Sequence, residues 1–130
     1  MKILLAEKRK DHTSAVKLAL TQIKDCECKK ISSIIIADDI KKLDKKLKKE
    51  KPDILIFDGD FISYQTKENI SFLKTLYPEM SILVLAASFK QEKKFTKVGI
   101  EDFILKDSAE KFYNEMVIFL NKESNKKRNI

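Results

Sequence analysis

The chain has 130 residues, of which 43% are hydrophobic, and its 27 Lys and Arg outnumber its 20 Asp and Glu to give a net charge of +7. This length suits one domain with a buried core. No apolar run reaches the roughly 18 residues of a transmembrane helix, and the apolar start Ile3–Ala6 is too short for a signal peptide. We therefore expect a soluble, cytoplasmic protein with no membrane partner.

Along the chain, short runs rich in Ile, Leu and Val alternate with longer amphipathic segments. The runs lack strict alternation of polar and apolar residues, which is typical of strands covered on both faces. They lie at Ile3–Ala6, Ile31–Ala37, Ile54–Phe57, Ile82–Ala87 and Phe103–Leu105.

The segments between and after these runs predict five helices. We expect Asp11 or Thr13 to cap the first, Asp39 the second, which is rich in lysine, and Thr66 the third. Gly99 suits the position just after the end of the fourth helix. The fifth begins near residue 108. We expect the domain to span residues 1–121 and residues 122–130 to form a basic, disordered tail or the start of a linker.

Two other features of the sequence give no specific function. Cys26 and Cys28 are the only cysteines and His12 is the only histidine. A structural zinc site takes four ligands, so we interpret both cysteines as reduced thiols. Lysines are concentrated in residues 41–51 and 121–130, without the interleaved aromatic side chains that stack on nucleic-acid bases.

Strands that alternate with helices predict an α/β fold, (βα)5, with a doubly wound, five-stranded parallel sheet. In such sheets the functional crevice lies at the carboxyl ends of the strands. Asp58 ends the third predicted strand, Glu7 follows the first and Lys106 follows the last. These three side chains are therefore expected to meet at one edge.

The common enzymatic uses of this architecture lack their parts here. The first strand–helix turn contains no glycine, so it fits neither a dinucleotide nor a P-loop site. The chain has a single histidine and no G-x-S-x-G motif. The remaining acids and lysine suit a phosphoryl group, with an aspartate as nucleophile, a hard cation and a lysine clamp.

Four segments resemble response-regulator receiver domains in order along the chain: KILLAEK (2–8), KPDILIFDGD (51–60), YPEMSILVLAAS (77–88) and GIEDFILKD (99–107). The resemblance implies the flavodoxin-like strand order 2-1-3-4-5. It places Asp58 at the phosphoacceptor position and Lys106 at the invariant lysine. The acidic pair that holds magnesium falls on Glu7 and Lys8, and the two switch positions fall on Ala86 and Phe103.

The departures from the family pattern predict an impaired pocket. Lys8 replaces the second acid, so it should repel magnesium, weaken any site made by Glu7 and Asp58, and pair with Asp58 itself. Ala86 lacks the hydroxyl of the switch Thr or Ser. Asp60 lies where the family supplies a backbone carbonyl to the metal, and its side chain is a candidate to replace the missing acid.

The resemblance implies a module of two-component signalling that binds a histidine kinase or a downstream effector. We expect no enzymatic activity beyond self-phosphorylation at Asp58, and action mainly through protein contacts. Pairing of two copies through the fourth helix, fifth strand and fifth helix is a further expectation. One alternative is a phosphorylatable receiver that uses Asp58 with magnesium; another is a nucleic-acid module that uses the lysine-rich helix and tail.

Overall fold

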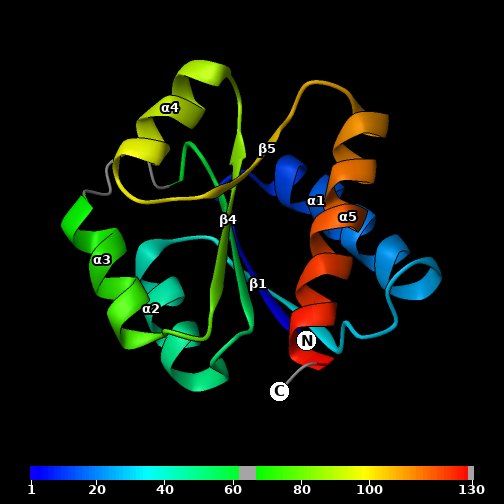
Figure 1. Cartoon of the computed structure of the whole chain (residues 1–130), viewed down its shortest axis with the longest axis horizontal. Coiled ribbons are helices and arrows are strands. Elements are labelled where there is room, and N and C mark those ends of the chain that lie inside the picture. The colour runs from blue at the N-terminus through cyan, green and yellow to red at the C-terminus, as the bar shows by residue number, and fades with distance from the viewer. Residues whose placement is uncertain (62–66, 129–130) are drawn as a thin grey trace.

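The computed structural model describes residues 1–61 and 67–128, which form five strands and five helices in strict alternation (Figure 1). The strands are β1 (Lys2–Ala6), β2 (Ser33–Ala37), β3 (Ile54–Asp58), β4 (Ser81–Ala86) and β5 (Asp102–Leu105). The helices are α1 (Lys10–Cys26), α2 (Ile40–Glu50), α3 (Lys67–Leu76), α4 (Phe89–Lys97) and α5 (Ala109–Arg128).

The strands form one parallel sheet in the order β2-β1-β3-β4-β5. Helices α1 and α5 cover one face of this sheet, and α2, α3 and α4 cover the other (Figure 1). This arrangement confirms the predicted doubly wound fold and its strand order.

Successive strand residues divide the core into two layers because side chains along a strand alternate between faces. Ile3 and Leu5 of β1 pack in the cluster that contains residues of α1 and α5. Leu4, between them, packs in the cluster that contains residues of α2, α3 and α4. All three are fully buried, which explains why the strands read as continuous apolar runs.

The helix boundaries confirm some predicted caps and correct others. The side chain of Asp39 accepts a hydrogen bond from the Lys42 amide at 2.8 Å, as expected for the cap of α2. Gly99 follows α4 with a φ of +100°, a conformation that favours glycine. The prediction for α1 was wrong, because the helix begins earlier and its N-cap, Arg9, makes no side-chain capping bond. The predicted cap Thr66 lies outside the described residues.

The prediction of a loose tail from residue 122 was also wrong, since α5 continues to Arg128. Glu123 and Ser124 in this last part are only 2% and 6% exposed. The Ser81 hydroxyl donates a hydrogen bond of 2.9 Å to Glu123, which ties the end of α5 to the start of β4. The polar residues from 122 onward therefore gave no indication that this segment packs on the domain.

The sequence also led to expectations about the two cysteines and about membrane-spanning helices. Cys26 is exposed and Cys28 is buried, and both are free thiols. Among the described residues, no helix combines the length and apolar character needed to cross a membrane.

Candidate functional site

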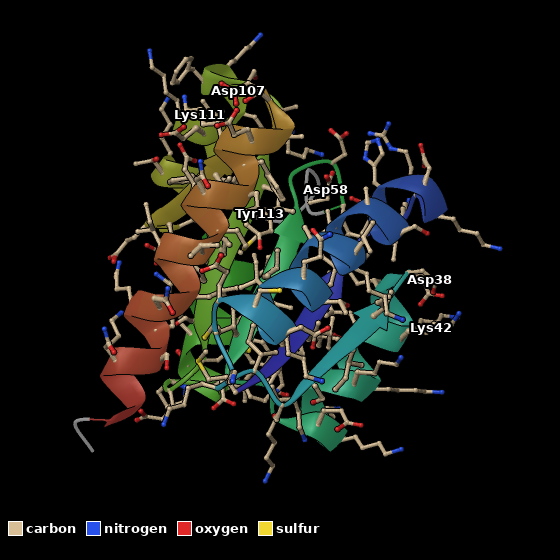
Figure 2. The ribbon with its side chains drawn as sticks, turned by 90° about the vertical axis from the view of Figure 1, so that its right-hand side faces the viewer. Asp38, Lys42, Asp58, Asp107, Lys111 and Tyr113 are labelled. Carbon is tan, nitrogen blue, oxygen red and sulfur yellow. The ribbon has the colours of Figure 1, made fainter. Side chains whose placement is uncertain are left out.

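The parallel register brings three predicted site residues to one edge of the sheet. Asp58 is the last residue of β3, next to β1, and Glu7 directly follows β1. Lys106 directly follows β5, where its amide donates to the Ala86 carbonyl at 2.9 Å. Figure 2 shows Asp58 at the end of its strand, close to the start of α1. The edge predicted to be functional thus carries a compact group of charged side chains.

Asp58 is held as a buried carboxylate, because it is only 1% exposed and both of its oxygens accept hydrogen bonds. The Lys106 ammonium donates to Oδ2 and forms an ion pair with it. The Asp60 amide donates to Oδ1 at 3.0 Å. Burial alone would raise the pKa of Asp58, but hydrogen bonds from Lys106, Glu7 and the Asp60 amide outweigh it and lower the pKa.

Glu7 is also buried, at 2% exposure, but its surroundings favour the protonated form. Burial is the largest influence and raises its pKa; the Arg9 amide, which donates to Oε1 at 3.0 Å, opposes this, and the nearby Asp58 raises the pKa further. Oε2 receives no hydrogen bond from the described residues, whereas a protonated Glu7 donates to Asp58. The two neighbouring carboxyls therefore titrate as a pair in which Asp58 ionises first.

His12 joins this group, a placement that the sequence reasoning missed. One ligand atom each from Glu7, His12 and Asp58 lie within 4.8 Å of one another. The imidazole Nδ1 is buried and has no hydrogen-bond partner in the described structure. A signal was present in the sequence, because His12 falls in the first turn of the helix that follows Glu7.

Asp60 lies at the rim of the site and does not belong to this convergent group. Its carboxylate forms an ion pair with Arg9, Nη2 to Oδ2, at 2.5 Å, and accepts a hydrogen bond from Gln91 Nε2 at 3.3 Å. Gln91 Oε1 in turn accepts from the Ala87 amide at 2.7 Å. The Gln91 amide occupies the place of a side chain on Gly59, since a Cβ there would overlap it.

Lys8 is not where the sequence led us to expect it. Its side chain is exposed and makes no hydrogen bond or ion pair with any residue that the structure describes. Its expected contact with Asp58 is absent, because Lys106 already supplies the cation. A long, strongly hydrated lysine loses side-chain entropy and hydration if it enters a pocket that is already neutralised.

The two expected switch positions lie on the neighbouring strands β4 and β5. Ala86 ends β4 and is fully buried. Phe103 of β5 is half-buried and packs against the core cluster that includes Phe95 of α4. Ser88, the nearest hydroxyl after Ala86, caps α4 by accepting from the Gln91 amide at 3.2 Å.

An open groove of about 860 Å³ leads from the charged group along the space between α1 and α5. Asp58 and Lys106 line one part of it, and the remainder is largely apolar, with Leu18 from α1 and Phe112 from α5. Tyr113 of α5 also lines it, and Figure 2 shows this residue on the side of α5 toward Asp58. The groove gives Asp58 its contact with the surface.

Comparison with known proteins identifies the fold. No family model and no curated protein matches the sequence. Among solved structures, the receiver domain of RcsB from Salmonella enterica serovar Typhimurium, in the presence of a phosphomimetic, aligns with 94% of this chain and 88% of its own, with 20% identity and a TM-score of 0.71. A receiver-domain protein from Clostridium thermocellum aligns with 98% of this chain and 96% of its own, with 16% identity and a TM-score of 0.72.

A third structure, an RcsB–DNA complex, aligns with 94% of this chain at 21% identity and a TM-score of 0.73. This chain spans 60% of that longer RcsB chain. The fold is therefore that of response-regulator receiver domains.

Proposed function

We propose that the chain is a receiver-type module of two-component signal transduction that works mainly through contacts with a protein partner, either a histidine kinase or a downstream effector. The observation that carries this proposal is the state of Asp58. Its carboxylate is buried and bonded through both oxygens, to Lys106 and to the Asp60 amide. The Lys106 ammonium therefore already supplies a cationic partner for this carboxylate from within the fold.

The rim of the pocket supports impaired phosphorylation. A phosphoryl group on Asp58 would bring oxygens that need hydrogen-bond donors. Ala86 offers no hydroxyl, Ser88 caps α4, and the Ala87 amide is bonded to Gln91. The switch hydroxyl is therefore missing at position 86, and the Ala87 amide is already bonded.

Magnesium fits this donor set only in part. Glu7 and Asp58 offer the carboxylate oxygens that Mg²⁺ prefers, and Oε2 of Glu7 receives no hydrogen bond from the described residues. Asp60, the proposed replacement for the missing acid, is instead paired with Arg9. Glu7 and Asp58 would hold the ion, which would neutralise charge on an incoming phosphoryl group.

The alternative function is a working phosphoacceptor, and one observation favours it. Asp58 and Lys106 both line the groove between α1 and α5, so a small phosphodonor has a route to them. In that reaction an Asp58 oxygen would form a bond to phosphorus while the donor's leaving group departs with its electron pair. Lys106 would then stabilise a phosphoryl oxygen.

Intact-mass spectrometry distinguishes the two functions. The chain is incubated with Mg²⁺ and a small phosphodonor such as acetyl phosphate, beside Asp58→Ala and a receiver domain with a complete acidic pair as positive control. We expect added phosphoryl mass in the positive control and none in the parent chain. Addition to the parent but not to Asp58→Ala would overturn the impaired pocket and establish the phosphoacceptor.

Gln91→Ala tests the cause of the impairment in the same assay. This change frees the Ala87 amide without touching Asp58 or Lys106. If the rim limits phosphorylation, the variant gains phosphoryl mass under conditions in which the parent does not. An unreactive variant assigns the block to the Asp58–Lys106 pair and to the missing second acid.

A further inference from the structure

Two buried polar atoms in the candidate site have no hydrogen-bond partner in the described structure: Glu7 Oε2 and His12 Nδ1. Buried polar groups are normally satisfied, and each exception calls for an explanation. Glu7 is 98% removed from solvent, since its exposure is 2%. Both residues, with Asp58, place a ligand atom within 4.8 Å of the others. The three side chains therefore converge on one small region of the pocket.

The chemistry of these three ligands differs from that of a magnesium site. Mg²⁺ is a hard cation that takes oxygen ligands and retains water. An imidazole nitrogen together with carboxylates suits Zn²⁺ and related first-row metals. His12 is therefore the residue that sets the class of ion, whereas Glu7 and Asp58 alone would leave that class open.

The ligand atoms are near enough to one another to contract onto a zinc ion. Tetrahedral ligands about 2.0–2.1 Å from zinc lie roughly 3.4 Å from one another. The separations here are at most 4.8 Å, so small side-chain rotations complete the contraction. Asp58 keeps an unused lone pair, because a carboxylate has about four acceptor sites and it accepts from Lys106, from the Asp60 amide and from Glu7.

An outer group already orients one of the ligands, and a second lies near another. The Arg9 amide fixes Glu7 through Oε1, which leaves Oε2 free to turn to the cation. Asp11 Oδ2 lies 4.0 Å from His12 Nε2, on the side of the ring opposite the orphaned Nδ1. At this distance Asp11 makes no hydrogen bond to the ring, but its carboxylate is near enough to become the outer-shell partner that metal-bound histidines usually have.

We propose that Glu7, His12 and Asp58 bind a divalent first-row transition-metal ion, for which Zn²⁺ is the best match, through Glu7 Oε2, His12 Nδ1 and one oxygen of Asp58. Three protein ligands leave a fourth position, which opens toward the groove that His12 and Asp58 both line. The site requires no phosphorylation of Asp58 and does not rest on the proposed signalling function.

The test is titration of the metal-free, full-length chain with Zn²⁺ alone, by calorimetry. Parallel titrations use His12→Asn and the double variant Cys26→Ser/Cys28→Ser, because the two thiols are the other zinc-binding groups that a titration could detect. We expect one Zn²⁺ per chain in the parent and in the cysteine variant. We expect His12→Asn to bind at least about tenfold more weakly while its circular dichroism and metal-free Tm match those of the parent.

Co²⁺ supplies a spectroscopic check on the ligands. Binding through nitrogen and oxygen gives visible ligand-field bands, whereas cysteine ligation adds an intense thiolate charge-transfer band in the near ultraviolet. We expect only the former, and its loss in His12→Asn. The proposal is overturned if the parent binds no Zn²⁺, if the thiolate band appears and binding disappears with the cysteines, or if His12→Asn binds as tightly as the parent.

Discussion

At the scale of single residues, the ion pair between Lys106 and Asp58 has an environment unlike that of a surface pair. The side chain of Asp58 is 1% exposed and that of Lys106 is 22% exposed, whereas both partners in the Lys111–Asp107 pair are more than half exposed. Removing one partner of a buried pair leaves the other as an uncompensated buried charge. An exposed pair contributes little.

We therefore expect Lys106→Met to lower the free energy of unfolding by about 2 kcal/mol at pH 7, less than a fully buried pair would lose because Lys106 is partly hydrated. Lys111→Met, the matched control, should cost no more than about 0.5 kcal/mol. Urea unfolding with EDTA present measures both. Equal effects of the two changes would show that burial of Asp58 does not strengthen its pair.

The loss of stability in Lys106→Met should depend on pH. The pKa of Asp58 is lowered below its ordinary value of 3.8, so its ionised form stabilises the fold above that value. This contribution is lost as pH falls through the lowered pKa. The difference in stability between the parent and Lys106→Met should therefore be constant near neutral pH and should shrink below about pH 4. A difference that grows in acid would contradict the assignment.

Glu7→Gln should stabilise the fold, whereas Lys106→Met should destabilise it. The pKa of Glu7 is raised above 4.5, mainly by burial, so Glu7 favours the folded state while protonated and this benefit is lost as pH rises through the raised pKa. Glutamine imitates the protonated form and supplies a donor beside Asp58. We expect it to stabilise the metal-free chain by about 1 kcal/mol at pH 7, with little gain at pH 4. Thermal unfolding at both values, with EDTA present, provides the measurement.

Single-residue detail is also where sequence reasoning was least complete. Asp58 and Lys106 were placed correctly beside one another, because strand ends in a parallel sheet share an edge. Of the two lysines expected to contact Asp58, only Lys106 does so. The sequence does not reveal that the side chain of Lys8 extends into solvent. His12 and Gln91 were missed as members of the site because each enters it from a helix, through rotamers that no sequence period encodes.

At the scale of secondary-structure elements, the sequence predicted more. All five strands lie within about two residues of the apolar runs, because both faces of the sheet are covered and no strand face is left polar. The end of α5 was the exception. Its last turns carry mainly polar residues, and only tertiary packing shows that Glu123 points inward to Ser81.

Glu123→Ala tests that packing. The change removes the acceptor of the Ser81 hydroxyl and the partner of Lys126, whose ammonium lies 3.4 Å from Glu123. We expect the free energy of unfolding to fall by about 1–2 kcal/mol, the usual cost when a buried hydrogen bond loses one partner. Asn125→Ala, an exposed change in the same turn, should remain within about 0.5 kcal/mol of the parent. Denaturant unfolding of both variants would contradict the packing role if they proved equal.

At the scale of the whole molecule, the net charge of +7 makes nucleic acid a second class of partner to test. The excess charge is most concentrated on α2, but part of it is bound locally. Lys42 pairs with Asp38 at 2.9 Å, and the Lys46 ammonium donates to the Ile36 carbonyl at 2.6 Å. The exposed lysines that remain available to phosphates are Lys41, Lys45, Lys48 and Lys49.

We expect this surface to bind duplex DNA only at low ionic strength. Attraction between exposed charges is screened beyond about 8 Å at 0.15 M salt, and each phosphate contact adds to the salt dependence of binding. Fluorescence anisotropy with a nonspecific duplex should show binding that disappears before about 0.15 M salt. Replacing the four exposed lysines with Gln should flatten the salt dependence, whereas Lys111→Met on α5 should not. If binding persists at that salt and is lost in the fourfold variant, the lysine-rich helix is a nucleic-acid interface. That result would contradict the proposed function through protein contacts.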